Sequence, residues 1–256
     1  METTMNDFAW ISPQPPVPAA EKGANLRLDE IDDLIKRVIA EVRPWTMVPD
    51  EGLATTIRLA LGAIDAGIPG DLVECGVWKG GCSFAMLLAQ RYAFGEIRRP
   101  VWMYDSFQGM GAISPQDGEH ARWWKQRSLS GAPDPDKQDY CAASLAEVRN
   151  NVARLDFNEH VRIVPGWLQA TLSNIVPEKI AVLRIDCDWY EPVKCVLEEL
   201  APLVSTGGPI ILDDYGIWEG CTLATHEYLA KHQLPWAIKS SPNDTGVWMI
   251  KTKANW

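Results

Sequence analysis

The sequence predicts an α/β fold in which helices cover both faces of a mainly parallel sheet. Two observations carry this prediction. From Asp71 onward, short apolar runs alternate with longer segments of helical periodicity, the pattern of strand–helix–strand units. The chain also has 256 residues, 46% of them hydrophobic, which suits one sizeable domain with a small appendage.

The first 70 residues precede this alternation. Residues 1–25 contain "SPQPPVPAAEKG" and little periodic hydrophobicity, so we predict a disordered or loosely docked arm. Residues 26–70 are expected to form a helical cap. Its first helix covers residues 28–42, where apolar side chains recur on one face, and its second covers residues 52–66.

Residues 71–256 are expected to form the main domain. Five strands are predicted in the ranges 71–77, 100–105, 160–166, 180–186 and 207–214. Helices are predicted in the ranges 78–93, 143–155, 191–203 and 220–232. Residues 236–252 have the pattern of two strands joined by a turn, so an antiparallel hairpin is expected to finish the sheet.

One segment, residues 107–142, does not fit the alternation. It is long and polar, and it contains the adjacent Trp123 and Trp124. A loop of this length inside a compact domain is usually a functional lid or a disordered segment. We favour a lid, and residues 107–142 are called the lid segment below.

Charge and cysteine usage exclude several classes of protein. The net charge is -10 and the pI about 4.9, so a nucleic-acid substrate is not expected, and no basic run suits an anionic membrane surface. No stretch is long enough to span a bilayer. The six cysteines form no CxxC pair and have no zinc-site spacing, which is typical of reduced thiols in a cytoplasmic protein.

Carboxylates follow four of the predicted strands. Glu74 and Asp105 end the first two, and the pairs Asp186/Asp188 and Asp213/Asp214 end the last two. Ligands of open parallel sheets bind at these strand ends, so one crevice is expected to receive all of them. Oxygen ligands of this kind suit Mg²⁺. Alternatively the aspartates cap the following helices, which accounts for one Asp per helix but not for two.

The turn after the first strand, "ECGVWKGG", has the small residues that a ligand needs to approach the backbone. Its spacing is not the dinucleotide fingerprint, so a simple tight turn remains the alternative. Asp105 stands where an acidic side chain commonly accepts hydrogen bonds from ribose hydroxyls, which indicates a nucleoside ligand. An Asp at a strand end can also cap a turn.

Six segments, in this order, resemble the TylF/macrocin type of S-adenosylmethionine (SAM)-dependent O-methyltransferases. They are "TMV" (46–48), "IPGDLVECGVWKGG" (68–81), "VWMYDSFQGM" (101–110), "VPGWLQATL" (164–172), "LRIDCDWYEP" (183–192) and "GGPIILDDYGIWEG" (207–220). The resemblance covers about residues 44–250. It implies a class I methyltransferase fold, Rossmann-like, with seven strands of which the last is antiparallel.

Carried over motif by motif, the resemblance implies the site residues. SAM would be bound by Thr46, Met47, Glu74, Gly76, Gly80, Gly81, Ser83, Asp105, Ser106, Gly166, Trp167 and Asp186. Within this set Glu74 and the glycines would hold the methionine part, Asp105 the ribose, and Gly166 with Trp167 would lie near the adenine. Mg²⁺ would be bound by Asp186, Asp213 and Asp214, with Asp188 as the general base.

This assignment is chemically coherent. The sulfonium of SAM already has a good leaving group, whereas an alcohol is a poor nucleophile until a metal lowers its pKa. Chelation of two neighbouring hydroxyls would also fix the attack geometry. We therefore expect a vicinal diol, on a sugar or catechol of a small natural product, as the acceptor. His226 is an alternative base, although a packing histidine is the simpler interpretation.

Two other functions would account for part of the sequence. "DCD" satisfies the D-x-D pattern of metal-dependent nucleotide-sugar glycosyltransferases, but that pattern explains neither "DDY" nor "ECGVWKGG". A non-catalytic relative that only binds the cofactor would not need four mutually repelling aspartates. The lid segment and "DCDWYEP", which replaces a "DGDSY"-like motif, depart from the family pattern on the acceptor side. A homodimer is expected because the family often forms dimers.

Overall fold

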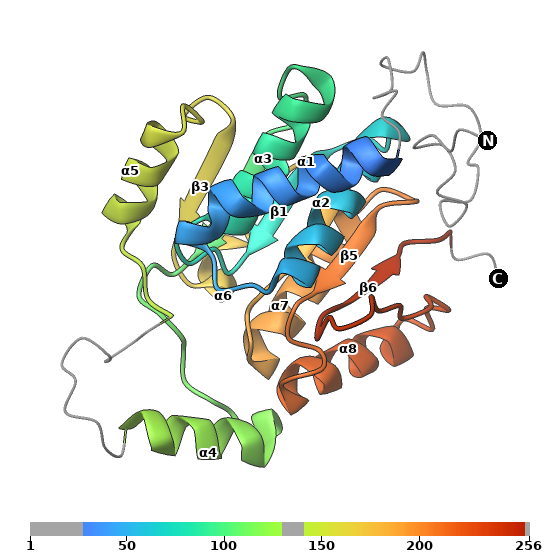
Figure 1. Cartoon of the computed structure of the whole chain (residues 1–256). Helices are drawn as coiled ribbons and strands as arrows, with labels where there is room; N and C mark the ends of the chain where they lie inside the picture. Colours follow the sequence, from blue (N-terminus) through green and yellow to red (C-terminus); the bar gives the residue numbers. More distant parts are fainter. Residues whose placement is uncertain (1–27, 130–140, 254–256) are drawn as a thin grey trace.

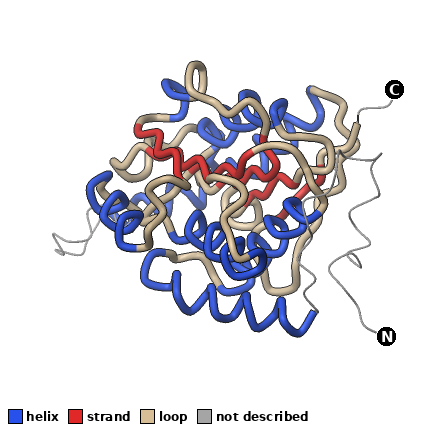
Figure 2. The backbone as a smooth tube through the Cα atoms, turned by 90° about the horizontal axis from the view of Figure 1, so that it is seen from above, coloured by secondary structure: helices blue, strands red, loops and turns tan. Residues whose placement is uncertain are grey.

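The computed structural model describes residues 28–129 and 141–253. One six-stranded sheet lies between two layers of helices, as Figures 1 and 2 show from two directions. The predicted arm, residues 1–25, lies outside the described residues, as does the part of the lid segment between residues 130 and 140. No helix in the described ranges is long and apolar enough to cross a membrane.

The sheet has the strand order β3-β2-β1-β4-β5-β6. Its strands are β1 (Asp71–Cys75), β2 (Val101–Asp105), β3 (Val161–Pro165), β4 (Ile180–Ile185), β5 (Pro209–Leu212) and β6 (Val247–Ile250). The first five are parallel, and β6 pairs antiparallel with β5. The strand order reverses between β1 and β4, and a crevice at the carboxyl ends of two such strands is where α/β sheets bind ligands.

The predicted fold class is confirmed, but the expected count of seven strands is wrong for the described residues, which form six. The first strand of the expected hairpin is reduced to one bridge, in which Lys239 and Trp248 exchange two backbone hydrogen bonds. The chain then turns away, because Ser241 contacts the Thr55 hydroxyl at 2.9 Å and Pro242 follows with no N–H to donate.

The helices of one layer are α1 (Leu28–Val42), α2 (Asp50–Asp65), α3 (Gly81–Phe94) and α5 (Leu145–Arg154). Helix α1 places Ile31, Ile35 and Val38 in the core, three or four residues apart, so its apolar stripe packs on α2 and α3. Ser144 caps the start of helix α5, because its hydroxyl accepts a hydrogen bond from the Glu147 amide.

The helices of the opposite layer are α6 (Leu168–Thr171), α7 (Tyr190–Leu200) and α8 (Glu219–Lys231). Successive strand residues serve the two layers: Leu72 belongs to the core under α1–α3, and Val73 to the core under α7 and α8. The two cores together bury the sheet on both faces. The carboxyl ends of the parallel strands are therefore the edge left for a ligand.

Within the lid segment the described residues form a 3₁₀ turn, η3 (Pro115–Asp117), and a helix, α4 (Gly118–Leu129). Figure 1 draws α4 apart from both helical layers, and its neighbours are η3 and α8. The turn and the helix thus lie against the carboxyl-end side of the fold, next to the loops that follow β4 and β5.

Candidate active site

A cavity of about 720 Å³ opens at the carboxyl ends of the five parallel strands. The predicted site residues that line it are Thr46, Met47, Glu74, Gly76, Gly81, Asp105, Ser106, Trp167, Asp186, Asp188, Asp213 and Asp214. Three predicted residues, Gly80, Ser83 and Gly166, are not among its lining residues. The loops after all five strands contribute to this one cavity, which is large enough for a cofactor and an acceptor side by side.

Two glycines let the chain segments around the cavity approach closely. A side chain on Gly76, where φ is +85°, would place its Cβ 1.6 Å from the Asp186 carbonyl oxygen. A Cβ on Gly81 would lie 2.5 Å from the Cβ of Thr46. The first contact joins the turn after β1 to the loop after β4, and the second joins it to the segment between α1 and α2.

Asp105 pins the turn after β1. Its Oδ2 accepts hydrogen bonds from the amides of Val77 (2.7 Å) and Trp78 (3.0 Å), and its Oδ1 accepts one from Phe107 (2.7 Å). A carboxylate has about four acceptor positions, so one remains for a ligand hydroxyl. The turn-capping role and the ribose-binding role are therefore compatible in the same side chain.

Glu74 and Ser83 form a buried pair at the floor of the cavity. The Ser83 hydroxyl donates to Glu74 Oε2 at 2.5 Å, and both side chains are almost fully buried. Burial raises the pKa of Glu74 to about 7, although the positive charge of Arg184 acts in the opposite direction. Ser83 therefore supports Glu74 from behind and does not face the cavity.

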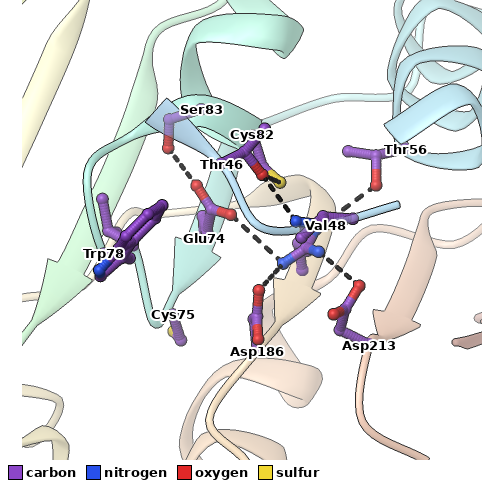
Figure 3. Close-up of polar contacts among 12 residues, drawn as sticks. Thr46, Val48, Thr56, Glu74, Cys75, Trp78, Cys82, Ser83, Asp186 and Asp213 are labelled. Atoms are coloured by element: carbon purple, nitrogen blue, oxygen red, sulfur yellow. Dashed lines mark hydrogen bonds and ion pairs between the residues drawn. The ribbon is translucent and has the colours of Figure 1, made fainter. Parts of the chain in front are cut away.

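Arg184, which was not among the residues predicted from the sequence, is a buried cation in this acidic site. It is fully buried, and its guanidinium contacts Asp213 Oδ1 (2.5 Å), Asp186 Oδ2 (2.6 Å) and Glu74 Oε1 (3.3 Å). Figure 3 shows these three carboxylates directed toward a common centre, to which dashed lines join them. The sequence signal for Arg184 was a charged residue inside the apolar run "AVLRID". It stands two positions before Asp186, so the two side chains point to the same side of the chain.

A second group of carboxylates lies beside the first. Asp186, Asp188 and Asp214 each offer one oxygen, and these oxygens lie within 4.8 Å of one another. The Asp188 amide donates to Asp214 Oδ2 at 2.9 Å. Burial, reinforced by the neighbouring negative charges, raises the pKa of Asp188 to about 8 and that of Asp214 well above its usual range.

This geometry fits a hard divalent cation. The donors are carboxylate oxygens, the kind that Mg²⁺ and Ca²⁺ prefer, and they lie close enough together to share one ion. The grouping differs in one member from the expected ligand set of Asp186, Asp213 and Asp214. Asp213 lies on Arg184, and Asp188 stands in the group instead.

The remaining predicted residues lie around the cavity as follows. Thr46 is buried and its hydroxyl accepts a hydrogen bond from the Val48 amide, whereas the Met47 side chain is 42% exposed at the cavity. Trp167 is also exposed and lines it. The alternative base His226 is not a lining residue, and its Nε2 lies 2.8 Å from the Tyr215 hydroxyl.

Aromatic side chains form one wall next to the carboxylates. Trp189 and Trp218 line the cavity with their ring centroids 5.0 Å apart, and Trp124 of α4 packs edge-on against both at 5.9 Å. Trp123 instead is 52% exposed. Of the two lid tryptophans, Trp124 is thus the one that packs beside the site.

Sequence comparison gives the family. The model of the macrocin O-methyltransferase (TylF) family matches residues 19–251. The chain is 37% identical to a Streptomyces olivaceus enzyme named 8-demethyl-8-(2,3-dimethoxy-alpha-L-rhamnosyl)-tetracenomycin-C 4'-O-methyltransferase, over 74% of this chain and 69% of the relative. It is 35% identical to the demethyldecarbamoylnovobiocin O-methyltransferase of Streptomyces niveus, over 83% of this chain and 80% of the relative.

Structural comparison agrees. The solved structure of the O-methyltransferase NovP superposes with a TM-score of 0.73 and 30% identity, over 87% of this chain and 98% of NovP. The calicheamicin methyltransferase CalS11, at 17% identity and a TM-score of 0.55, shares the fold over 93% of this chain and 99% of its own. The chain therefore belongs to the macrocin O-methyltransferase (TylF) family and is a SAM-dependent O-methyltransferase.

Proposed function

We propose that this enzyme transfers the methyl group of SAM to a sugar hydroxyl of a glycosylated natural product, in a reaction that depends on Mg²⁺. The observation that carries the proposal is the group of Asp186, Asp188 and Asp214 in the same cavity as the glycine turn and Asp105. An ion held by these carboxylates would lie next to the expected cofactor site. Both would therefore act on one acceptor hydroxyl.

SAM would lie across the carboxyl ends of β1 and β2. Gly76 and Gly81 would let it approach the backbone, and the free acceptor position of Asp105 would receive a ribose hydroxyl. Met47 and Trp167, both exposed at the cavity, would cover its sides. The sulfonium supplies the methyl group and its leaving group, so the protein mainly has to orient the attacking oxygen.

Asp186, Asp188 and Asp214 would hold the ion, which when bound lowers the pKa of an acceptor hydroxyl. We assign Asp188 to the ion because its carboxylate lies with those of Asp186 and Asp214, whereas Asp213 is outside this group. The alternative has Asp213 on the ion and Asp188 as the base alone. In either assignment an oxygen of Asp188 is the candidate acceptor of the hydroxyl proton. A vicinal diol is the acceptor pattern that fits either assignment, since two adjacent oxygens hold one orientation.

The acceptor class is supported from two sides. The names of the relatives describe methylation of a rhamnosyl-tetracenomycin and a demethyldecarbamoylnovobiocin, and a further relative, from Micromonospora griseorubida at 35% identity, is named mycinamicin III 3''-O-methyltransferase. The same cavity is also bordered by apolar side chains, the buried Trp189 and Trp218 and the exposed Ile217, beside which a sugar or a ring system can pack. The family match does not favour the glycosyltransferase alternative.

The test is methyl transfer to matched pairs of glycosides and their aglycones. The purified enzyme is incubated with SAM and each compound, in Mg²⁺ or in EDTA, and the products are identified by mass spectrometry. We expect one methyl group on the sugar of at least one glycoside, in Mg²⁺ only. Methylation of the aglycone would contradict the sugar acceptor, and full activity in EDTA would contradict the metal.

Two further proposals concern the cellular location of the enzyme and its oligomeric state. We propose a cytoplasmic location, which suits Cys75, Cys82 and Cys221, all buried as thiols. The homodimer stays a prediction that gel filtration would test. Neither affects the assignment of the site.

A further inference from the structure

Asp117, the last residue of η3 in the lid segment, is built into the body of the protein. Its side chain is only 1% exposed. Its Oδ1 accepts a hydrogen bond from the Tyr190 amide at 2.6 Å, and its Oδ2 accepts from the Ser114 amide (2.6 Å) and hydroxyl (2.8 Å). A carboxylate buried at this depth is stable only with such donors, so the contact is specific.

The Tyr190 amide belongs to the first turn of α7, directly after the aspartate loop. The residue before it, Trp189, provides no side-chain cap for this helix. Asp117 supplies the missing acceptor from 73 residues away in the chain, with a negative charge that suits a helix N-terminus. The lid segment therefore caps the helix that follows Asp186 and Asp188.

The same turn fits against the start of α8. A Cβ on Gly220 would lie 2.1 Å from Asp117 Oδ1, so only a glycine leaves room for the carboxylate. The His120 ring Nδ1 lies 3.2 Å from the Ile217 carbonyl oxygen. Residues 117–120 are thus seated between the N-termini of α7 and α8.

A second connection runs through the tryptophans. The His120 ring lies 4.8 Å from Trp218, and Trp124 packs against the same indole. The Trp218 Nε1–H donates to Asp188 Oδ1 at 3.0 Å. Asp188 has φ +58°, a conformation that a non-glycine residue adopts only where its surroundings hold it.

We infer that Asp117 and Trp218 are positioning residues through which the lid segment sets the orientation of the Asp188 carboxylate. Asp117 fixes the end of the loop that carries Asp188, and Trp218 fixes the carboxylate itself. Asp117 belongs to the lid segment, and other residues of that segment pack on Trp218. The Asp188 carboxylate is therefore correctly oriented only while residues 114–124 are in place. The inference rests on the proposed function for its consequence, which is that the lid tunes the affinity of the cation site.

The test compares four variants with the wild type. Trp218→Phe keeps the packed ring but removes the N–H, and Asp117→Ala removes the cap. Asp117→Asn keeps one acceptor oxygen for the Tyr190 amide. Gln126→Ala is the matched control, since Gln126 is on the same helix, is exposed and does not line the cavity.

The first readout is hydrogen exchange by NMR in EDTA, which needs no metal. It follows the Tyr190 amide, which donates to Asp117, and the Trp218 indole N–H, which donates to the Asp188 carboxylate. Asp117→Ala is expected to speed exchange at both by about three- to tenfold, with Asp117→Asn in between and Gln126→Ala unchanged. Wild-type exchange at the Trp218 indole in Asp117→Ala would overturn the inference.

The second readout is calorimetric titration with Mg²⁺ and, separately, with S-adenosylhomocysteine. Trp218→Phe and Asp117→Ala should weaken Mg²⁺ binding by about three- to tenfold while the affinity for S-adenosylhomocysteine stays within about twofold. Equal losses of both affinities would show a merely structural role and overturn the inference. No Mg²⁺ binding by the wild type would contradict the proposed function, and the exchange result would still decide the positioning role.

Discussion

The acidic end of the sheet has two halves, and they are built differently. In one half, Glu74, Asp186 and Asp213 surround the buried guanidinium of Arg184. In the other half, Asp188 and Asp214 accept hydrogen bonds from neutral donors, the Trp218 indole and the Asp188 amide. Asp186 belongs to both, since its carboxylate also lies in the group with Asp188 and Asp214.

The first half would suit a structural role, and the second would suit the binding of a cation. The first half carries its own positive charge, so it is stable without any ligand. The second half has three carboxylates within reach of one point and, among the described residues, ion-pairs only through Asp186. Because negative charges at this distance repel one another, an added cation would stabilise the second half far more than the first.

The largest expected effect comes from removing the cation of the first half. Arg184→Met would leave the buried Glu74 and the part-buried Asp186 and Asp213 without their partner, and we expect a loss of about 3–5 kcal/mol in the free energy of unfolding. Urea denaturation followed by circular dichroism measures it. The matched control is Arg58→Met, which breaks an ion pair of Arg58 with Asp32 that is 39% and 54% exposed and should cost at most about 1 kcal/mol. Similar losses in the two variants would contradict the comparison.

The next effect comes from adding a cation to the second half. At a free Mg²⁺ concentration one hundred times its Kd, binding should stabilise the folded protein by about 2.7 kcal/mol, seen as a rise in Tm. Asp214→Asn and Asp188→Asn should abolish this rise. Asp213→Asn should retain it, because Asp213 is outside the group of three carboxylates that would hold the ion. The reverse result for Asp188 and Asp213 would favour the ligand set implied by the family resemblance.

A third effect, of similar size, concerns pH. The pKa of Glu74 is raised by burial from 4.5 to about 7, so the folded state binds this proton more tightly than the unfolded chain. Its contribution to stability is therefore full below about pH 4.5 and is lost as the pH rises through about 7. Glu74→Gln should flatten the pH dependence of stability over this range by on the order of 3 kcal/mol. Parallel curves for variant and wild type would show that Arg184 keeps Glu74 ionised throughout.

The smallest effect tests the edge of the first half. Arg184 Nε donates to the Thr56 hydroxyl at 3.4 Å, a long hydrogen bond. Thr56→Val keeps the shape of the side chain and should cost about 0.5–1.5 kcal/mol in urea denaturation. A cost as large as that of Arg184→Met would mean that Thr56, rather than the carboxylates, holds the guanidinium in place.

The sequence predicted those features whose signal is local. The alternation of strands and helices gave the fold class, and the carboxylates stood at the strand ends where the structure has them lining one cavity. Arg184 was missed because its main partners come from three different strand ends, and Asp117 because its partner amide lies 73 residues away. Which of two adjacent aspartates lies on an arginine depends on such long-range packing. No spacing rule within a motif contains it.

The contact between Asp117 and Gly220 has a consequence for protein engineering. Exchanging residues 107–142 with the matching segment of a relative would be one way to probe which compounds such an enzyme accepts. Here Asp117 of the lid segment fits a space that exists only because residue 220 lacks a side chain. A transplanted segment with Asp at position 117 therefore needs glycine at position 220 of the recipient, so a chimaera has to move the two positions together.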